Sequence, residues 1–123
     1  DWAYDKLLKF KESGYKLKII TARKEKFKDY TYSWINNHFP NMFCDVYFTN
    51  HFSNKSIPKS DVIKKIWADY MFEDNYDYAL DVVQNTWAKT FLLSQPWNQN
   101  IQIKNDKIYR FQCWNDFQQD LIV

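Results

Sequence analysis

Short apolar runs alternate along this chain with longer segments in which apolar residues recur at helical spacing, and this alternation limits the fold more than any other feature. Short apolar runs between polar loops are typical of strands in a sheet that is covered on both faces. Strands that alternate with helices form βαβ units, so the pattern predicts an α/β fold with a mainly parallel sheet and helices on both faces. We expect strands at residues 16–20, 45–49, 70–72, 90–93 and 108–111, and helices at 2–12, 27–38, 61–67, 77–86 and about 114–121.

The composition favours one domain with a core rich in aromatic rings. No internal repeat, linker or Pro/Gly-rich tract divides residues 1–123, and 20% of the residues are aromatic. We expect most Trp and Tyr rings in the core, with Trp97 as an exception in a loop, and His38 packed on an apolar helical face. Gly14 is the single glycine and follows the first helix, where a C-terminal cap would lie.

The chain has no apolar run near the length of a membrane span, so we expect no membrane segment and a cytoplasmic location. Cys44 and Cys113 lack the spacing of a metal site, and the Lys-rich composition favours buried free thiols over a disulfide. The net charge is +2, with basic residues concentrated in the first half and acidic residues in the second. Such charges are more often solvated faces than a nucleic-acid footprint, so nucleic acid is not the expected partner.

Three groups of polar side chains fall at strand ends or just before a helix, where ligands bind in open parallel sheets. The first is Thr21, whose hydroxyl and following N–H groups suit a phosphate oxygen; alternatively, it caps the next helix. The second is Lys59, at a helix start, where the dipole disfavours a cation unless it neutralises a phosphate or a nucleophilic carboxylate. The alternative is an exposed lysine, with Lys55 as a competitor for the same role.

The third group is Glu73 and Asp74, which close the strand at 70–72, with Asp77 one turn further on. Clustered carboxylates repel one another and need a cation, and an oxygen-rich site of this kind suits Mg²⁺. The alternative is an acidic helix N-terminus that is stabilised by the helix dipole. The order of the three groups, Thr then Lys then an acidic pair, is more specific than any one of them.

This order resembles motifs II, III and IV of the haloacid dehalogenase (HAD) superfamily. The matching residues are Ile19-Ile20-Thr21-Ala22-Arg23, then Lys59 ahead of a helix, then the segment 68–75 that contains Glu73-Asp74. The segments 77–80, 91–93, 95–98 (Gln-Pro-Trp-Asn), 109–111 and 114–117 resemble the end of the 5′-nucleotidase-like branch. The similarity covers nearly all of residues 4–121.

The resemblance implies a Rossmann-like sheet and a Mg²⁺-dependent phosphohydrolase, a phosphatase or 5′-nucleotidase that works through an aspartyl-phosphate. Its substrates would be nucleoside monophosphates or similar small phosphoesters. The resemblance further implies that Thr21 and the Ala22 backbone bind the phosphoryl group and that Arg23 reaches the substrate. Lys59 would steady the charge on nucleophile and phosphate.

For the metal, the resemblance implies that Asp74 is a direct Mg²⁺ ligand and that Glu73 and Asp77 act from the outer coordination sphere. Glu73 departs from the family, which has two Asp residues or Gly-Asp at these two positions. A larger departure concerns the Asp-x-Asp of motif I, which supplies the nucleophile and the general acid and occurs nowhere in residues 1–123. We therefore expect the chain to be inactive by itself and to be the C-terminal portion of a longer protein.

In the family, the motif I strand lies between the strands that end at Thr21 and Glu73. Two buried strands facing a gap would leave backbone groups unpaired, so we expect an upstream segment to supply this strand. The alternatives are that a second chain supplies it or that the remaining strands close up. One alternative is a HAD-like pseudoenzyme that serves as a binding or regulatory module. A third hypothesis is a nucleic-acid-binding domain that uses the basic half and exposed aromatic rings, with binding that falls steeply with salt.

Overall fold

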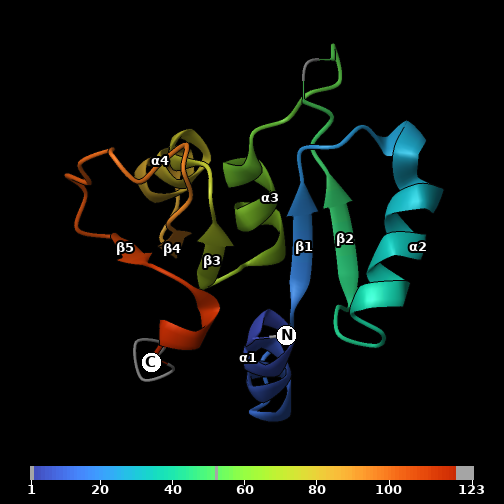
Figure 1. Cartoon of the computed structure of the whole chain (residues 1–123). Coiled ribbons are helices and arrows are strands. Elements are labelled where there is room, and N and C mark those ends of the chain that lie inside the picture. Colours follow the sequence, from blue (N-terminus) through green and yellow to red (C-terminus); the bar gives the residue numbers. More distant parts are fainter. Residues whose placement is uncertain (1, 52, 119–123) are drawn as a thin grey trace. The chain divides into compact units, whose positions relative to one another are not determined.

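The computed structural model describes residues 2–51 and 53–118 and has a mixed α/β architecture (Figure 1). The chain forms two compact units, an N-terminal unit up to Pro58 and a C-terminal unit from Lys59 onward. Every strand pairing in the described residues is parallel, as the alternation of strands and helices predicted. The elements are α1 (Trp2–Glu12), β1 (Lys18–Thr21), a 3-10 turn (Glu25–Phe27), α2 (Lys28–His38), β2 (Asp45–Phe48), α3 (Lys59–Ile66), β3 (Tyr70–Glu73), α4 (Tyr76–Asn85), β4 (Lys89–Leu93), β5 (Ile108–Phe111) and a 3-10 turn (Trp114–Asp116).

The first helix, α1, ends at the predicted glycine cap. Gly14 has a φ of 97°, a left-handed conformation that favours glycine. The Tyr15 N–H donates to the Phe10 carbonyl (3.1 Å) and the Gly14 N–H to the Lys11 carbonyl (3.0 Å), the bond pattern of a Schellman motif. The rings of Phe10 and Tyr15 meet edge to face at 6.2 Å, which supplies the hydrophobic contact of that motif.

The N-terminal unit is built on a two-stranded parallel sheet, in which β1 pairs with β2 from Lys18↔Asp45 to Thr21↔Phe48. Helix α2 forms the crossover between these strands, because parallel neighbours cannot be joined by a tight turn. It buries Thr31 and Ile35. The opposite side of α2 is exposed, which places several aromatic rings in solvent.

The C-terminal unit contains a three-stranded parallel sheet with the order β3-β4-β5. Helix α4 packs against this sheet, and Ala79 and Val83 from the helix meet Leu92 and Ile108 from the strands. Successive side chains of a strand point to opposite faces, so Phe91 lies on the other face of β4. There it contacts a cluster of rings from β3, β5 and the chain that follows β5, namely Tyr70, Phe72, Tyr109 and Phe117.

The predicted final helix at about 114–121 is wrong over its described part. A 3-10 turn spans Trp114–Asp116, and Phe117 then adopts an extended backbone conformation (φ −68°, ψ 126°). The ring of Phe117 is buried and meets Phe72 at 5.1 Å, so its burial overrides the local helical pattern. The last part of the expected helix lies outside the described residues.

Three smaller expectations also need correction. The thiols are free as predicted but not buried, because Cys44 is exposed and Cys113 half-buried. His38 is exposed rather than packed in the core. Many large aromatic rings are exposed too, although they were expected in the core: Tyr15, Tyr30, Trp34, Trp67, Trp87 and Tyr109. No described helix has the length and apolar character needed to cross a membrane.

Substitution Leu92→Ala tests the core of the C-terminal unit. Leu92 has no exposed surface and packs against α4, so its truncation should leave a cavity and lower the free energy of unfolding by about 2–5 kcal/mol. Urea denaturation followed by circular dichroism measures the loss. Ile101→Ala, at a side chain that is 37% exposed, is the control and should change stability by less than about 0.5 kcal/mol. Equal losses for both variants would contradict the described core.

Candidate functional site

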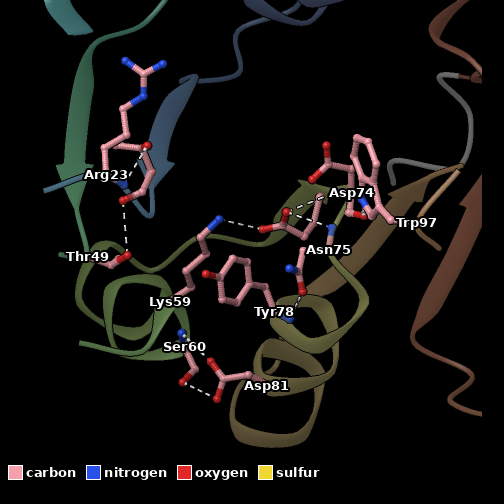
Figure 2. Close-up of polar contacts among 11 residues, drawn as sticks. Arg23, Thr49, Lys59, Ser60, Asp74, Asn75, Tyr78, Asp81 and Trp97 are labelled. Carbon is pink, nitrogen blue, oxygen red and sulfur yellow. Dashed lines mark hydrogen bonds and ion pairs between the residues drawn. The ribbon is translucent and has the colours of Figure 1, made fainter. Parts of the chain in front are cut away.

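Lys59 and Glu73 form a buried ion pair at the ends of α3 and β3 (Figure 2). The Lys59 Nζ lies 2.8 Å from the Glu73 Oε1, and the two side chains are only 9% and 7% exposed. The same ammonium lies over the ring of Tyr78, 4.4 Å from its centroid. The reading of Lys59 as an exposed lysine is therefore wrong. Its positive charge at the helix start is offset by the Glu73 carboxylate, a partner that the sequence did not single out.

The second carboxylate oxygen of Glu73 holds the loop that follows β3. Its Oε2 accepts hydrogen bonds from the backbone N–H groups of Asp74 (3.0 Å) and Asn75 (3.2 Å). Asn75 in turn caps α4, because its Oδ1 accepts from the Tyr78 N–H at 3.1 Å. Both oxygens of Glu73 are thus engaged by the protein itself.

The backbone of Asp74 is fixed from the opposite side by the loop after β4. Its carbonyl oxygen accepts from the Trp97 Nε1 at 2.8 Å (Figure 2). The same oxygen also accepts from the Asn98 Nδ2 at 2.7 Å. Its carboxylate, in contrast, makes no hydrogen bond or ion pair with any described residue. Asp74 is half-buried, so this carboxylate can be reached from solvent. Asp77 is exposed in the first turn of α4, as the helix-dipole interpretation expects.

Asn98 is the centre of the network that fixes the loop after β4, and it is only 1% exposed. Its Nδ2 also donates to the Leu93 carbonyl (2.9 Å), and its Oδ1 accepts from the Gln95 N–H (3.2 Å) and the Arg110 guanidinium (2.9 Å). Arg110 donates further to the Ser94 hydroxyl at 3.0 Å. A buried amide with all four positions satisfied is a rigid support. In the sequence, Asn98 and Arg110 stand out only as members of the segments 95–98 and 109–111, and neither is assigned a role.

Asp81 supplies the anion at the N-terminus of α3. Its Oδ2 accepts from the Ser60 N–H (3.0 Å) and its Oδ1 from the Ser60 hydroxyl (2.9 Å). A carboxylate at a helix N-terminus satisfies free N–H groups and interacts favourably with the dipole. Because Asp81 belongs to α4, these bonds join α3 to α4 beside the ion pair. Nothing in the sequence singled out this pairing.

Thr21, Ala22 and Arg23 lie at the end of β1 in the N-terminal unit. The Thr21 hydroxyl accepts from the Arg23 N–H at 3.2 Å, and the Thr21 carbonyl accepts from Thr49. Thr21 does not cap the following helix, because the 3-10 turn begins after Lys24 and α2 after Phe27. The guanidinium of Arg23 donates to the Thr31 hydroxyl at 3.3 Å. The structure therefore forms one cluster around Thr21 and, in the C-terminal unit, another around Lys59.

The carboxylates are only in part suited to the expected Mg²⁺. In the described residues, no group of three or more His, Cys, Asp or Glu side chains is placed to hold a metal ion. Both carboxylate oxygens of Glu73 already accept hydrogen bonds, one from Lys59 and the other from two backbone N–H groups. Asp74 retains a free carboxylate and fits the role of one oxygen ligand. The remaining ligands would have to come from water, substrate or residues outside those described.

Comparisons of the chain with protein-family models, with characterised proteins and with solved structures find no significant match to any of them.

Substitution Lys59→Met tests the buried ion pair. It leaves the Glu73 carboxylate buried without its cation, so the free energy of unfolding should fall by about 3–5 kcal/mol. Adding Glu73→Gln should restore a substantial part of the loss, because the second charge is then removed as well. Lys18→Met, which breaks the more exposed pair with Asp45 (3.5 Å), should barely move the urea midpoint. A Lys59→Met protein as stable as the wild type would contradict the burial of the pair.

Alkaline titration tests the environment of Tyr78. Burial, and then the negative charge of Glu73, raise the pKa of the Tyr78 hydroxyl above its ordinary value of 10.0. The native state therefore holds this proton more tightly than the unfolded state, and the resulting stability is complete below about pH 10 and is lost as the pH rises through the folded-state pKa.

The measurement is absorbance at the tyrosinate band for the wild type and for Tyr78→Phe. The difference curve should have a midpoint above 10.0, and Tyr78→Phe should lose less stability than the wild type as the pH rises past that value. A difference midpoint at or below 10.0 would overturn the assignment.

Proposed function

We propose that residues 1–123 are the C-terminal portion of a HAD-type core and contribute to a Mg²⁺-dependent phosphohydrolase for nucleoside monophosphates or similar small phosphoesters. The observation that carries the proposal is the cluster of Lys59, Glu73 and Asp74 at the carboxyl end of β3. Ligands of open parallel sheets bind at this end of the strands. The cluster offers a lysine and one unengaged carboxylate on a rigid loop, which suits a charged phosphoester with a cation.

Each residue has a defined part in this proposal. Asp74 would supply a carboxylate ligand to Mg²⁺, and the bound metal would draw charge from the phosphoryl oxygens. Lys59, held in place by Glu73, would add positive potential beside the phosphate. Thr21 and the Ala22 backbone would bind phosphoryl oxygens at the end of β1, with Arg23 turned toward the rest of the substrate. Glu73 acts as a positioning residue, because both of its oxygens are already bound by the protein.

The nucleophile and the general acid would come from an Asp-x-Asp strand outside residues 1–123. The open edge of β3 is consistent with this requirement, since β3 pairs only with β4 among the described strands. β1 likewise pairs only with β2. A strand edge without a partner exposes N–H and C=O groups that another strand can satisfy. An upstream segment or a second chain is the proposed source.

A second candidate is a HAD-like pseudoenzyme that binds or regulates without hydrolysis. The satisfied ion pair favours it, because the Lys59 Nζ is already bound to Glu73 and lies over the ring of Tyr78. In the pseudoenzyme, a lysine buried in this way would hold α3 against β3. The two candidates differ in whether any form of the protein turns over phosphoesters.

The test is phosphate release from a panel of nucleoside monophosphates with Mg²⁺. We expect activity only when the chain is extended into its upstream coding sequence, and a loss of roughly a hundredfold or more in kcat for Asp74→Asn. Asp69→Asn is the matched control, since this exposed aspartate precedes the other end of β3 and should leave activity unchanged. If the extended protein is folded but releases no phosphate, and its upstream sequence lacks Asp-x-Asp, the phosphohydrolase is rejected and the pseudoenzyme is supported.

A further inference from the structure

Helix α2 and the turn before it present an exposed stripe of rings together with neighbouring cations in the N-terminal unit. The rings are spaced three, four and four residues apart, so they line one side of the helix. Phe27 is 49% exposed, Tyr30 66% and Trp34 44%, and His38 is exposed at the end of the helix. The aromatic–basic stripe comprises Arg23, Lys26, Phe27, Tyr30, Trp34 and His38.

The cations of the stripe lie over the faces of its rings. The guanidinium of Arg23 is 5.6 Å from the centroid of Tyr30, and the ammonium of Lys26 is 5.2 Å from that of Phe27. Both distances are within the range of cation–π attraction. Arg23 is also held by Thr31, a buried residue of α2, so its charge is fixed beside the rings.

The far end of the stripe is a stacked pair of rings. Trp34 and His38 lie parallel, with centroids 4.4 Å apart and an interplanar angle of 21°. The His38 Nδ1 is 2.9 Å from the Trp34 carbonyl, which fixes the orientation of the imidazole. Solvent-exposed rings are normally scattered singly, whereas Trp34 and His38 are stacked on each other and Tyr30 and Phe27 each lie against a cation. Ordered rings lose little conformational entropy when a ligand stacks on them.

We propose that the aromatic–basic stripe binds single-stranded nucleic acid. Bases provide flat π faces on which the rings can stack. Arg23 and Lys26 form no ion pair with a carboxylate among residues 2–51 and 53–118, and phosphates would supply the negative charge that they lack. From Tyr30 to His38 the helix rises about 12 Å, a length that a few stacked nucleotides can follow. A duplex does not fit equally well, because its bases are already stacked on one another.

Charge placement favours nucleic acid over an anionic membrane. An interfacial helix buries a continuous apolar face in the acyl region and keeps its cations on the opposite face. In the stripe, Arg23 and Lys26 lie on the ring faces themselves, so insertion of the rings would carry the charges into hydrocarbon at a large cost. The proposal does not require the phosphohydrolase, since none of the rings has a part in that site and Arg23 is the one residue named in both proposals.

The test is fluorescence anisotropy of a labelled single-stranded oligonucleotide of mixed sequence, titrated with the full chain. We expect binding that weakens as salt is raised from about 50 to about 200 mM. Tyr30→Ala and Trp34→Ala should each weaken binding by roughly tenfold, through the loss of a stacking platform. Lys26→Gln should weaken binding and reduce the slope of log K against log salt by about one, since one phosphate contact is lost.

The matched control is Trp67→Asn. Trp67 is 77% exposed and stacks on Trp87 at 5.3 Å in the C-terminal unit, so the variant removes an equally prominent ring outside the stripe. Asparagine also tolerates the positive φ of 56° at this position. This variant should bind the oligonucleotide as the wild type does. Circular dichroism verifies that each variant is folded, and Tyr30→Ala removes a ring that is mostly in solvent.

Several results would overturn the proposal. These are no oligonucleotide binding by the wild type, equal binding by folded Tyr30→Ala, and equal loss of binding in Trp67→Asn. Duplex of the same sequence bound as tightly as the single strand would also contradict it. Vesicles of phosphatidylserine and phosphatidylcholine serve as the competing probe. Binding to these vesicles that is lost in Tyr30→Ala, with no binding to oligonucleotide, would assign the stripe to a membrane surface instead.

Discussion

The buried ion pair between Lys59 and Glu73 is the interaction on which most of the C-terminal unit depends. Neither charge is tolerable alone in an apolar environment, so each partner requires the other to be in place. The pair joins the first residue of α3 to the last residue of β3. Since Glu73 also binds the two N–H groups before α4, one carboxylate organises three successive elements. The hydrogen bonds that Ser60 donates to the Asp81 carboxylate join α3 to α4 as well.

The consequence for the candidate site is a loop that is fixed on two sides and leaves one group unengaged. Glu73 holds the N–H groups of this loop, and Trp97 and Asn98 hold the Asp74 carbonyl. The Asp74 carboxylate is therefore presented by a rigid backbone without being committed to any described partner. Such preorganisation serves a metal ligand in a phosphohydrolase and a binding contact in a pseudoenzyme equally well. The two candidate functions consequently differ in whether the nucleophile and general acid of an Asp-x-Asp strand lie beside Asp74.

Element type was predictable from the sequence because apolar periodicity is a local signal. The segments expected as strands and helices before β5 all formed, with ends displaced by a few residues, as for β1 and α3. The failure came at Phe117, where a long-range aromatic cluster determines the backbone. The candidate site was less predictable. The sequence placed Glu73 near a metal, whereas its partner is a lysine fourteen positions earlier. Asn98 belongs to the matched segment 95–98, but its place at the centre of a hydrogen-bond network was not predictable, since burial of a polar side chain leaves no mark in the local sequence.

The purely parallel pairing of the strands has a consequence for how the chain acquires its structure. A parallel pair cannot be closed by a two-residue turn, so no hairpin is available as a local nucleus in the described residues. Each ladder can begin only after a connecting segment has brought distant residues together. The chain therefore loses the entropy of loop closure before any inter-strand hydrogen bond stabilises it. Contacts of this kind slow folding and leave strand edges uncovered in the meantime. Helices such as α4 form quickly by local bonds, so loop closure rather than helix formation limits the rate at which these sheets assemble.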